Sequence, residues 1–468
     1  MLVVGAGPCG LVAGITLARY GRDVVVVEKR ESGSSLSRAL VVSTRVMELM
    51  RRFGLEAAVR AGAADVDPTA LVTPSLTSSD GMLMSLGYPS DEEAATVSPC
   101  RPAWTPQAHH EPILLAHLSA FRTASVRFGA QLVALDQHEA AVRASLLDVA
   151  SGELQQVEAR YLIAADGAHS TARTEFGIAM EGPDELAVYE RVEFRAALDR
   201  AVGDRRHALY VLKHPAVDGA VLARRGRGDR WGLSRERPSD APGIDELSEH
   251  ELVAMIRTAT GVDDLNVVIE RLSSFTFAAQ IAEHYRRGRG FLIGDAAHRM
   301  TPRGGTGMNT GIQDAFDLGW KLAWVLNGWA PERLLDTYEY ERRPIGLHNV
   351  GRAAEPGGAR RTTDEALPWD LDDRLAHHWL DHNGQRVSTI DVIGDGLTVF
   401  ASLPDSRWSG VVAQTGFTAP LEEVILDADA AAALGLGPAG AVLVRPDGHE
   451  VARWSTPDNQ PEPGIAWL

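Results

Sequence analysis

The sequence predicts an α/β protein in which a parallel-sheet domain is interrupted by an antiparallel sheet and followed by a separate C-terminal domain. The first observation is a strand, a glycine turn, a helix and a second strand at the start of the chain. The second is a series of short alternating runs between residues 181 and 278, which is typical of antiparallel strands. The third is the return of strand-to-helix patterns after residue 290, which indicates that the first domain is discontinuous.

The opening unit reads as a βαβ pattern. Leu2 to Val4 form an apolar strand, residues 5–10 read Gly-Ala-Gly-Pro-Cys-Gly, an apolar-periodic run continues to Tyr20, and residues 23–28 form a buried parallel strand. Three further helices are predicted, over residues 44–53, 112–127 and 310–326.

The chain of 468 residues is too long for one ordinary core, so we expect several domains. The predicted first domain comprises residues 1–72, 101–180 and 279–352, the inserted domain 73–100 and 181–278, the linker 353–373 and the last domain 374–468. The linker is predicted because its residues are rich in Gly, Pro, Arg and acidic side chains without periodicity.

Charge and cysteine content exclude several classes of function. The net charge of −17 would repel phosphate backbones and anionic lipids, so no nucleic-acid or membrane partner is expected. Only Cys9 and Cys100 are present, which rules out a disulfide framework or a cysteine metal site. The chain enters its first strand directly after Met1 and has no apolar run of about 20 residues, so we expect a cytoplasmic protein.

The glycine turn carries the first chemical signal. Gly5, Gly7 and Gly10 stand between strand and helix, where glycines allow the tight turn, the approach of the backbone to a pyrophosphate and close helix packing. The amides and dipole of the helix start bind phosphate. Glu28 ends the next strand, where a carboxylate can accept from both ribose hydroxyls. The pattern therefore predicts a dinucleotide site rather than an ordinary α/β turn.

A second glycine run shows that the glycine pattern predicts a nucleotide site only when the flanking elements are in the right order. Residues 435–440 read Gly-Leu-Gly-Pro-Ala-Gly, but they follow a helix-like run at 427–434 and precede a strand at 441–444. This order is reversed, so we predict a loop without a nucleotide there.

Two later motifs make the signal specific. Residues 162–170 read Leu-Ile-Ala-Ala-Asp-Gly-Ala-His-Ser, and residues 294–298 read Gly-Asp-Ala-Ala-His, followed by Pro302 and by Arg-Gly-Gly-Thr-Gly-Met-Asn at 303–309. With the glycine motif before them, in this order and spacing, the chain resembles the flavoprotein monooxygenases of the para-hydroxybenzoate hydroxylase type. The resemblance covers nearly the whole chain.

The resemblance implies a Rossmann-like FAD-binding domain, an inserted antiparallel-sheet substrate domain and a C-terminal thioredoxin-like domain. It implies that Asp295 binds a ribityl hydroxyl and that the amides of residues 304–309 face the pyrimidine end of the flavin. Asp166 and Arg173 would border the pyrophosphate as secondary FAD contacts, and both are candidates for a passing contact with the nicotinamide cofactor.

Arg38 and Gln107 stand where the family has an arginine and a glutamine near the flavin, although either could be an ordinary surface residue. The complete set of expected cofactor-binding residues is Gly5, Gly7, Pro8, Cys9, Gly10, Glu28, Lys29, Arg38, Gln107, Asp166, Gly294, Asp295, Pro302, Gly305, Gly307, Met308 and Asn309.

The implied reaction is aromatic hydroxylation. NADPH or NADH reduces FAD and leaves, O2 adds to give a flavin C4a-hydroperoxide, and an electron-rich aromatic carbon takes the distal oxygen. Because only one dinucleotide fold is predicted, the nicotinamide cofactor would be a transient co-substrate. The wording of residues 301–309 is most similar to members that act on polycyclic polyketides in antibiotic pathways. A monomer and a homodimer are both compatible with the sequence.

Three alternative functions share part of this pattern. A flavin-dependent halogenase would carry a Trp-x-Trp-x-Ile-Pro segment, which is absent. A Baeyer-Villiger oxygenase on the same fold could carry nearly identical motifs, and product regiochemistry would distinguish it. A flavin-binding accessory protein without oxygenase activity would not couple NAD(P)H oxidation to substrate.

Several other residues are interpreted as structural. We expect His298 to pack under the glycine-rich loop rather than to act as a base, and no metal is predicted because residues 109–111 lack ligand spacing. No catalytic residue is assigned. The substrate would lie between the inserted sheet and the flavin, and the strand aromatics Tyr210, Trp231 and Phe275 are either ring contacts or core. The last domain contains no cysteine, which excludes thiol redox chemistry there.

Overall fold

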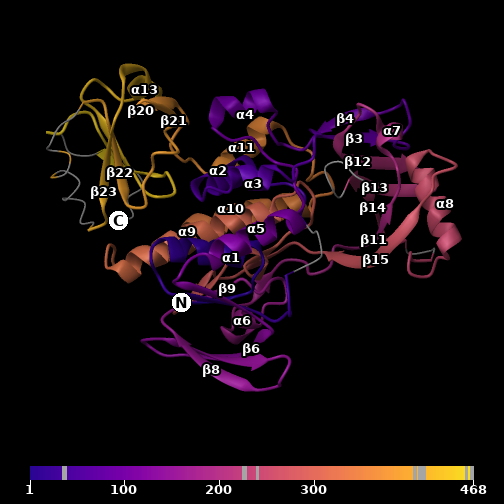
Figure 1. The fold of residues 1–468 in the computed structure, drawn as a ribbon, viewed down its shortest axis with the longest axis horizontal. Helices are drawn as coiled ribbons and strands as arrows, with labels where there is room; N and C mark the ends of the chain where they lie inside the picture. The colour runs from indigo at the N-terminus through magenta and orange to yellow at the C-terminus, as the bar shows by residue number, and fades with distance from the viewer. Residues whose placement is uncertain are drawn as a thin grey trace.

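The computed structural model describes residues 1–33, 39–223, 229–238, 242–403, 408, 410, 418–458 and 462–463. Figure 1 shows three parts: a central one around α1 and α9, a lobe at the right built on a large sheet, and the yellow C-terminal part at the upper left. The mixed α/β class predicted from the sequence is confirmed. None of the helices in the described ranges is both long and apolar enough to cross a bilayer.

The central part is built on a six-stranded sheet that is parallel except at one edge. Its strands, in spatial order, are β17 (Arg286–Arg287), β18 (Gly290–Leu292), β9 (Leu162–Ala164), β1 (Leu2–Val4), β2 (Val24–Glu28) and β5 (Ala124–Phe128). Only β17 pairs with its neighbour in the antiparallel sense. Strands from both ends of a 290-residue stretch therefore meet in one sheet.

Six helices of the described chain pack around this sheet. They are α1 (Pro8–Arg19), α2 (Thr44–Arg52), α3 (Glu56–Arg60), α5 (Gln107–Ser119), α9 (Gly307–Asn327) and α10 (Asp336–Ala354). α1 lies against both α5 and α9. Gly319 of α9 approaches α1 so closely that a Cβ would lie 2.8 Å from the Thr16 side chain.

The helix predicted over residues 112–127 is wrong at both ends. It starts at Gln107, contains Pro112 in its interior and ends at Ser119. Residues 124–128 are instead β5, which pairs in parallel with Val24–Glu28 along its whole length. Tertiary pairing with β2 thus overrode a local pattern that did not separate the two elements.

The right-hand lobe contains a seven-stranded sheet. Its strands, in spatial order, are β15 (Val268–Phe277), β11 (Ala187–Arg195), β14 (Arg230–Glu236), β13 (Val217–Ala223), β12 (His207–His214), β3 (Asp67–Thr73) and β4 (Met82–Ser85). The expected antiparallel pattern holds except that β3 and β12 pair in parallel. The predicted boundary placed residues 67–72 with the central sheet. Because β3 pairs with β12, these residues belong to the seven-stranded sheet instead.

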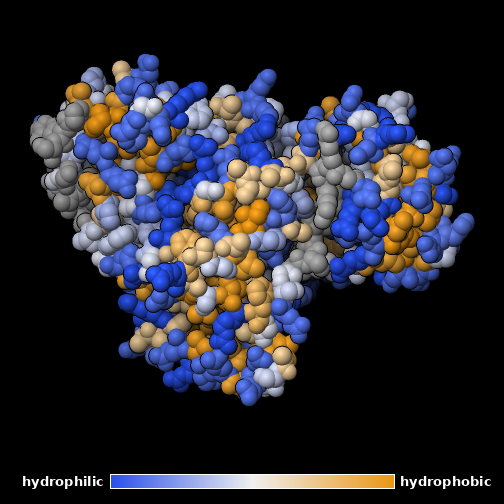
Figure 2. Space-filling model, viewed as in Figure 1, coloured by the Kyte–Doolittle hydropathy of each residue, from blue (hydrophilic) through white to orange (hydrophobic). Residues whose placement is uncertain are grey.

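One face of this sheet is covered by α8 (Glu249–Thr260), and the core between them includes Tyr210 and Trp231. These two aromatics are therefore core residues and not ring contacts of the candidate site. Figure 2 shows the lobe projecting to the right, with hydrophobic residues exposed on part of its surface.

The remaining elements of the first 354 residues are short. They are the sheet β6 (Ala130–Gln137), β7 (Val142–Asp148) and β8 (Leu154–Ala159), the sheet β10 (Met180–Glu181), β16 (Gln280–Ala282) and β19 (His298–Arg299), the helices α4 (Asp91–Val97), α6 (Thr171–Glu175) and α7 (Asp199–Val202), and the 3-10 turns η1 (Gly294–Ala296) and η2 (Glu332–Leu335).

The predicted linker at 353–373 is not merely a linker, because it contains α11 (Thr363–Leu371). Thr362 and Glu365 form a capping box at its start. Asp370 near its end accepts hydrogen bonds from the Arg45 backbone at 3.1 Å and from Gln313 at 3.2 Å. The segment is therefore attached to α2 and α9.

The C-terminal part has its own five-stranded sheet and a smaller hairpin. The sheet contains, in spatial order, β23 (Leu421–Ile425), β22 (Leu397–Ala401), β24 (Ala441–Val444), β25 (Glu450–Trp454) and β26 (Glu462–Pro463), and the hairpin is β20 (Trp379–His382) with β21 (Gln385–Ser388). α13 (Ala428–Ala433) precedes Gly435–Gly440 and β24, so the predicted helix, loop and strand order is confirmed.

Buried charges join the C-terminal part to α2. The Glu48 carboxylate contacts Arg45 at 2.8 Å and Arg374 at 2.5 Å, and it accepts from Ser98 Oγ at 2.7 Å. Burial would raise the pKa of Glu48, but the two guanidinium groups outweigh it and hold the pKa below its usual value. The ion pair therefore crosses between two regions that are far apart in the sequence.

His449 makes the same interface sensitive to alkaline pH. Its ring lies 3.3 Å from an Asp447 oxygen and 3.8 Å from an Asp372 oxygen. Burial would lower the pKa of His449, but these carboxylates raise it to about 9. A raised pKa stabilises the folded state below the unfolded value near 6.5, and this contribution is lost as pH rises through 9.

We therefore expect urea unfolding to show lower stability at pH 9 than at pH 6.5, and His449→Gln to reduce that difference. His214→Gln, on the surface of the large sheet, provides a control that should keep it. An unchanged pH dependence in His449→Gln would contradict this assignment.

Candidate active site

The glycine turn after β1 leaves a helix start open to a ligand. Gly5 has φ +107°, and a Cβ on it would lie 2.2 Å from the Ala165 carbonyl oxygen. A Cβ on Gly10 would lie 1.9 Å from the Gly5 oxygen, whereas one on Gly7 would meet no atom within 4 Å. Gly7 is the N-cap of α1, and no side chain caps the helix. The amides and positive dipole end of α1 are thus available to an anion.

Glu28 lies at the end of β2, beside this turn. Its carboxylate accepts from the Ala6 backbone at 3.0 Å and from the Arg30 side chain at 2.8 Å. Burial would raise the pKa of Glu28, but these hydrogen bonds leave it below the usual value, so the side chain is ionised at neutral pH. Lys29 next to it is exposed.

Asp166 and Arg173 hold the neighbouring turn together. Asp166 accepts from Ser170 Oγ and from the Ala172 backbone at 3.0 Å, so both of its oxygens support the start of α6. Arg173 donates to the Ala296 carbonyl at 3.1 Å and to the Ala168 carbonyl at 3.2 Å. The structure thus shows Arg173 joining the segment after β9 to η1.

Asp295 is exposed, whereas the residues immediately before and after it are buried. It projects from η1, and the preceding Gly294 has φ +57°. A Cβ on Gly294 would lie 2.9 Å from Cys9 Sγ, and one on Gly311 would lie 2.6 Å from the same sulfur. Cys9 therefore packs α1 against η1 and α9, and the Asp295 carboxylate is left free to meet a ligand.

Residues 301–306, which we call the α9 loop, lead into an uncapped helix. Thr306 is the N-cap of α9 and makes no capping hydrogen bond. Gly304 and Gly305 have φ +79° and +66°, a conformation that favours glycine. Pro302 accepts at its carbonyl from the Gly305 amide at 3.1 Å. A second helix N-terminus therefore opens near the first one.

Asn309 and Met308 fix the first turn of α9. Asn309 donates to Val41 and Gly305 carbonyls at 3.2 and 3.0 Å and accepts from the Ser43 amide at 2.9 Å. Met308 Sδ lies 3.2 Å from His110 Nε2. Burial lowers the pKa of His110 to about 4, so its ring is neutral at neutral pH.

Of the two residues predicted beside the flavin by single matches, the structure describes only Gln107. Gln107 is the first residue of α5, donates from its side chain to Glu111 at 2.9 Å and from its backbone to Ala39 at 2.9 Å. Arg38 lies outside the described residues.

His298 is fully buried, as expected for a residue packed under the loop, and its Nε2 lies 2.7 Å from Asp314. The other Asp314 oxygen accepts from Arg342 at 2.9 Å. The Arg342 guanidinium also reaches Asp372 at 2.8 Å. The sequence analysis did not single out Asp314 or Arg342. Together with His298 they connect β19, α9, α10 and the start of the C-terminal part.

One cluster of three carboxylates with metal-like spacing occurs in the described part of the chain: Asp317, Glu341 and Asp447. Lys321 lies 2.7 Å from both Asp317 and Glu341, and Arg445 lies 2.8 Å from both Glu341 and Asp447. These two cations balance the cluster, so it gives no reason to propose a metal.

An apolar cluster lies between the large sheet and the α9 loop. Tyr88, Trp104 and Leu209 belong to it, and Trp104 and Leu209 are only partly buried. The other members are Val41, Ala70, Met84, Leu86, Ala208, Val211 and Ala359. We call it the sheet-face cluster. Phe275 is not a member and packs against Tyr189 and Phe277.

Tyr88 is a residue of this cluster whose side chain hydrogen-bonds to the loop, and the sequence analysis missed it. Its hydroxyl lies 3.0 Å from the Gly304 carbonyl oxygen and 3.2 Å from that of Gly305. Its ring packs edge-on against Trp104 at 5.3 Å. No motif marks Tyr88, because its role depends on contacts across more than 200 residues of sequence.

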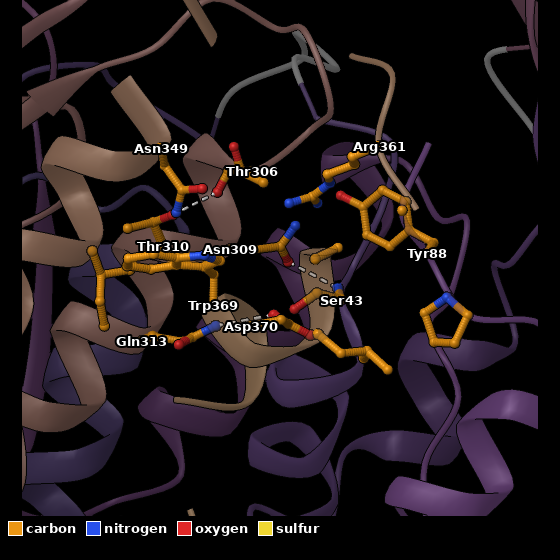
Figure 3. A pocket seen from close by; sticks show the side chains of 15 residues that line it. Ser43, Tyr88, Thr306, Asn309, Thr310, Gln313, Asn349, Arg361, Trp369 and Asp370 are labelled. Carbon is orange, nitrogen blue, oxygen red and sulfur yellow. Dashed lines mark hydrogen bonds between the residues drawn. The ribbon is translucent and has the colours of Figure 1, made fainter. Parts of the chain in front are cut away.

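Behind Tyr88 lies a small pocket whose lining includes many polar side chains, and which we call the polar pocket (Figure 3). Tyr88 and Arg361 lie side by side at one end, Asn309 is central, and Trp369 lies at the other end. Asn349 Oδ1 is buried there without a hydrogen-bond partner among the described residues. The pocket is formed by α9, α10, α11 and the segment before α4.

Comparison with known proteins identifies the family. Residues 1–353 match the family described as "FAD binding domain", and residues 372–466 match "Aromatic-ring hydroxylase, C-terminal". The chain belongs to the FAD-dependent aromatic-ring hydroxylases. The predicted resemblance is thereby confirmed, and with it the cofactor FAD and the monooxygenase class of enzyme.

The relatives of this hydroxylase include named monooxygenases and hydroxylases that match it along nearly the whole chain. It is 32% identical to the tetracenomycin B2 monooxygenase-dioxygenase of Streptomyces olivaceus, over 99% of this chain and 96% of the relative. It is also 32% identical to an aklavinone 12-hydroxylase of Streptomyces purpurascens, over 97% and 95% of the two chains.

A solved structure of aklavinone-11 hydroxylase with FAD and aklavinone superposes with a TM-score of 0.86 at 30% identity, covering 97% of this chain and 95% of the other. The fold of this hydroxylase is therefore that of FAD-dependent hydroxylases along nearly its whole length.

Proposed function

We propose that this hydroxylase uses NAD(P)H and O2 to hydroxylate a polycyclic phenolic substrate of the polyketide type. The observation that carries the proposal is the sheet-face cluster, whose partly exposed aromatic and aliphatic side chains adjoin the α9 loop. A flat apolar ring bound there would lie beside the predicted flavin site. The names of the full-length relatives support the polycyclic substrate class.

The residues present fit FAD. Two uncapped helix starts, at Gly7 and Thr306, offer amides to the pyrophosphate and to the flavin ring, and exposed Asp295 can accept from a ribityl hydroxyl. Ionised Glu28 is placed for the adenosine ribose. When bound, FAD supplies electron transfer from NAD(P)H and the activation of O2.

The protein's own residues bind, orient and exclude water. The sheet-face cluster would hold the aromatic ring at a fixed distance and keep water from the reacting carbon. The nicotinamide cofactor would bind transiently, since the parallel βαβ unit with a phosphate turn that the described residues form is assigned to FAD. We further propose that the large sheet is the substrate domain and that the C-terminal part is a thioredoxin-like domain with a role in assembly.

The test is anaerobic reduction of the FAD-loaded protein by NADPH, with and without a panel of polycyclic phenols that includes aklavinone. Ligand-accelerated reduction followed by a hydroxylated product in air would support the proposal. Mass spectrometry and regiochemistry would separate hydroxylation from ring-oxygen insertion. NADPH oxidation that no phenol stimulates, without product, would contradict it.

Asp295 provides a specific prediction for the cofactor site. We expect Asp295→Asn to weaken FAD binding roughly 10- to 100-fold, because a hydrogen bond to a charged acceptor contributes about 1.5–3 kcal/mol. The apo protein should unfold as the wild type does, since the side chain is exposed. Flavin fluorescence titration measures the affinity. Asp184→Asn, another exposed carboxylate, should bind FAD normally.

A further inference from the structure

Tyr88 contacts both the sheet-face cluster and the α9 loop. Its ring is part of the sheet-face cluster, together with Trp104 and Leu86, and its hydroxyl bonds to the backbone of the α9 loop. Thr301 and Thr306 of the loop are instead bonded to α10, through Ala353 at 2.7 Å and Arg352 at 3.0 Å. Tyr88 thus connects the loop to the segment that lines the proposed substrate site.

The contact helps to fix how the loop presents its backbone, because the Gly305 carbonyl lies within hydrogen-bond distance of both the Tyr88 hydroxyl, at 3.2 Å, and the Asn309 side-chain amide, at 3.0 Å. The peptide between Gly305 and Thr306 is planar and trans, so directing the Gly305 carbonyl toward Tyr88 directs the Thr306 amide away from it. Both glycines adopt positive φ and have no side chain to fix their peptides. A Cβ on Gly305 would lie 3.0 Å from the Tyr88 oxygen, so the close approach depends on glycine.

The Tyr88 ring is held from several sides. Trp104 packs edge-on against it, and the Arg361 guanidinium lies 5.8 Å from its centre. Arg361 Nε also donates to the Leu86 carbonyl at 3.3 Å. Figure 3 shows Tyr88 and Arg361 together at the edge of the polar pocket, with Asn309 nearby. A ligand that displaces Trp104 or Leu86 would therefore move the Tyr88 hydroxyl relative to the loop.

We propose that Tyr88 is a positioning residue that transmits occupancy of the sheet-face cluster to the α9 loop, so that an aromatic ligand changes the backbone that faces the flavin. The inference rests on the proposed function, since it takes the cluster as the substrate site. It assigns to one hydroxyl the coupling between substrate binding and the cofactor environment.

The test compares Tyr88→Phe with wild type, both loaded with FAD and saturated with aklavinone or whichever phenol of the panel binds. The substitution keeps the ring and removes the hydroxyl. We expect the ratio of flavin reduction rates with and without ligand to fall roughly fivefold or more, the change that losing one hydrogen bond of about 1 kcal/mol produces. Tyr210→Phe, which loses a hydroxyl bonded to the Arg205 carbonyl in the core of the same lobe, should keep the wild-type ratio.

Amide hydrogen exchange gives a readout that does not depend on turnover. In the wild type, ligand should change exchange at residues 304–306, and in Tyr88→Phe this ligand-dependent change should disappear. A wild-type ratio and a wild-type exchange difference in Tyr88→Phe would overturn the role of Tyr88 and leave the proposed function standing. Absence of any response of the wild type to the whole panel would overturn the proposed function itself.

Discussion

Gly7→Ala is expected to abolish tight FAD binding while leaving the apo protein folded. The added Cβ would meet no protein atom within 4 Å, and Gly7 has φ −74°, which alanine adopts without strain. The apo stability should therefore change by no more than about 1 kcal/mol. The methyl group would instead occupy the space that the pyrophosphate needs. Because several charge-assisted hydrogen bonds would be lost together, FAD affinity should fall on the order of 100-fold or more.

Gly10→Ala is the matched contrast. Its Cβ would lie 1.9 Å from the Gly5 carbonyl oxygen, so the turn itself must distort. We expect a loss of about 1–3 kcal/mol or more in the apo protein. Chemical unfolding of both apo variants, followed by FAD titration, separates the two effects. Normal FAD affinity in Gly7→Ala would show that the cofactor does not approach this turn.

Glu48→Gln is expected to destabilise the protein by about 3–5 kcal/mol, because it leaves two buried guanidinium groups without their carboxylate. Arg45 and Arg374 are 9% and 3% exposed at their side chains, and Glu48 is 1% exposed. The lowered pKa of Glu48 also means that its contribution is present above about pH 4.5 and is lost as pH falls through the folded value. Urea unfolding followed by tryptophan fluorescence measures the change.

Arg19→Gln tests the same interface at its exposed edge. Arg19 contacts Asp395 at 3.1 Å, but both side chains are about one-third exposed, so we expect a loss below about 1 kcal/mol. If Arg19→Gln and Glu48→Gln lowered the free energy of unfolding equally, the buried contacts of Glu48 with Arg45 and Arg374 would not be what holds the C-terminal part in place.

The sequence predicted well the elements whose signals are local. The turn of Gly5, Gly7 and Gly10 marked β1, α1 and β2, because it stands directly between the apolar runs that form these elements. The capping box of Thr362 and Glu365 was also a local signal, but it lay in a Gly- and Pro-rich stretch and was overlooked. The pattern of residues 112–127 failed because it merged the end of α5 with β5.

Features that depend on distant partners were not predictable. Glu48 looks like an ordinary helical glutamate until Arg374 is placed beside it. Tyr88 and Asp314 likewise gain their roles from residues 216 and 28 positions away. Residue type and spacing do not indicate such pairs. The motifs therefore predicted the cofactor site, whereas its supporting contacts and the sheet-face cluster could be found only in the fold.

The strand order of the central sheet also bears on how the chain is made. A nascent chain that has emerged as far as residue 200 contains β1, β2, β5 and β9, but β9 lacks its neighbour β18 at 290–292. α1 lacks α9, which packs against it and ends at Asn327. The side of α1 that packs against α9 therefore stays uncovered until about two-thirds of the protein has been made. Chaperones that shield apolar segments during translation would find their binding site on this helix.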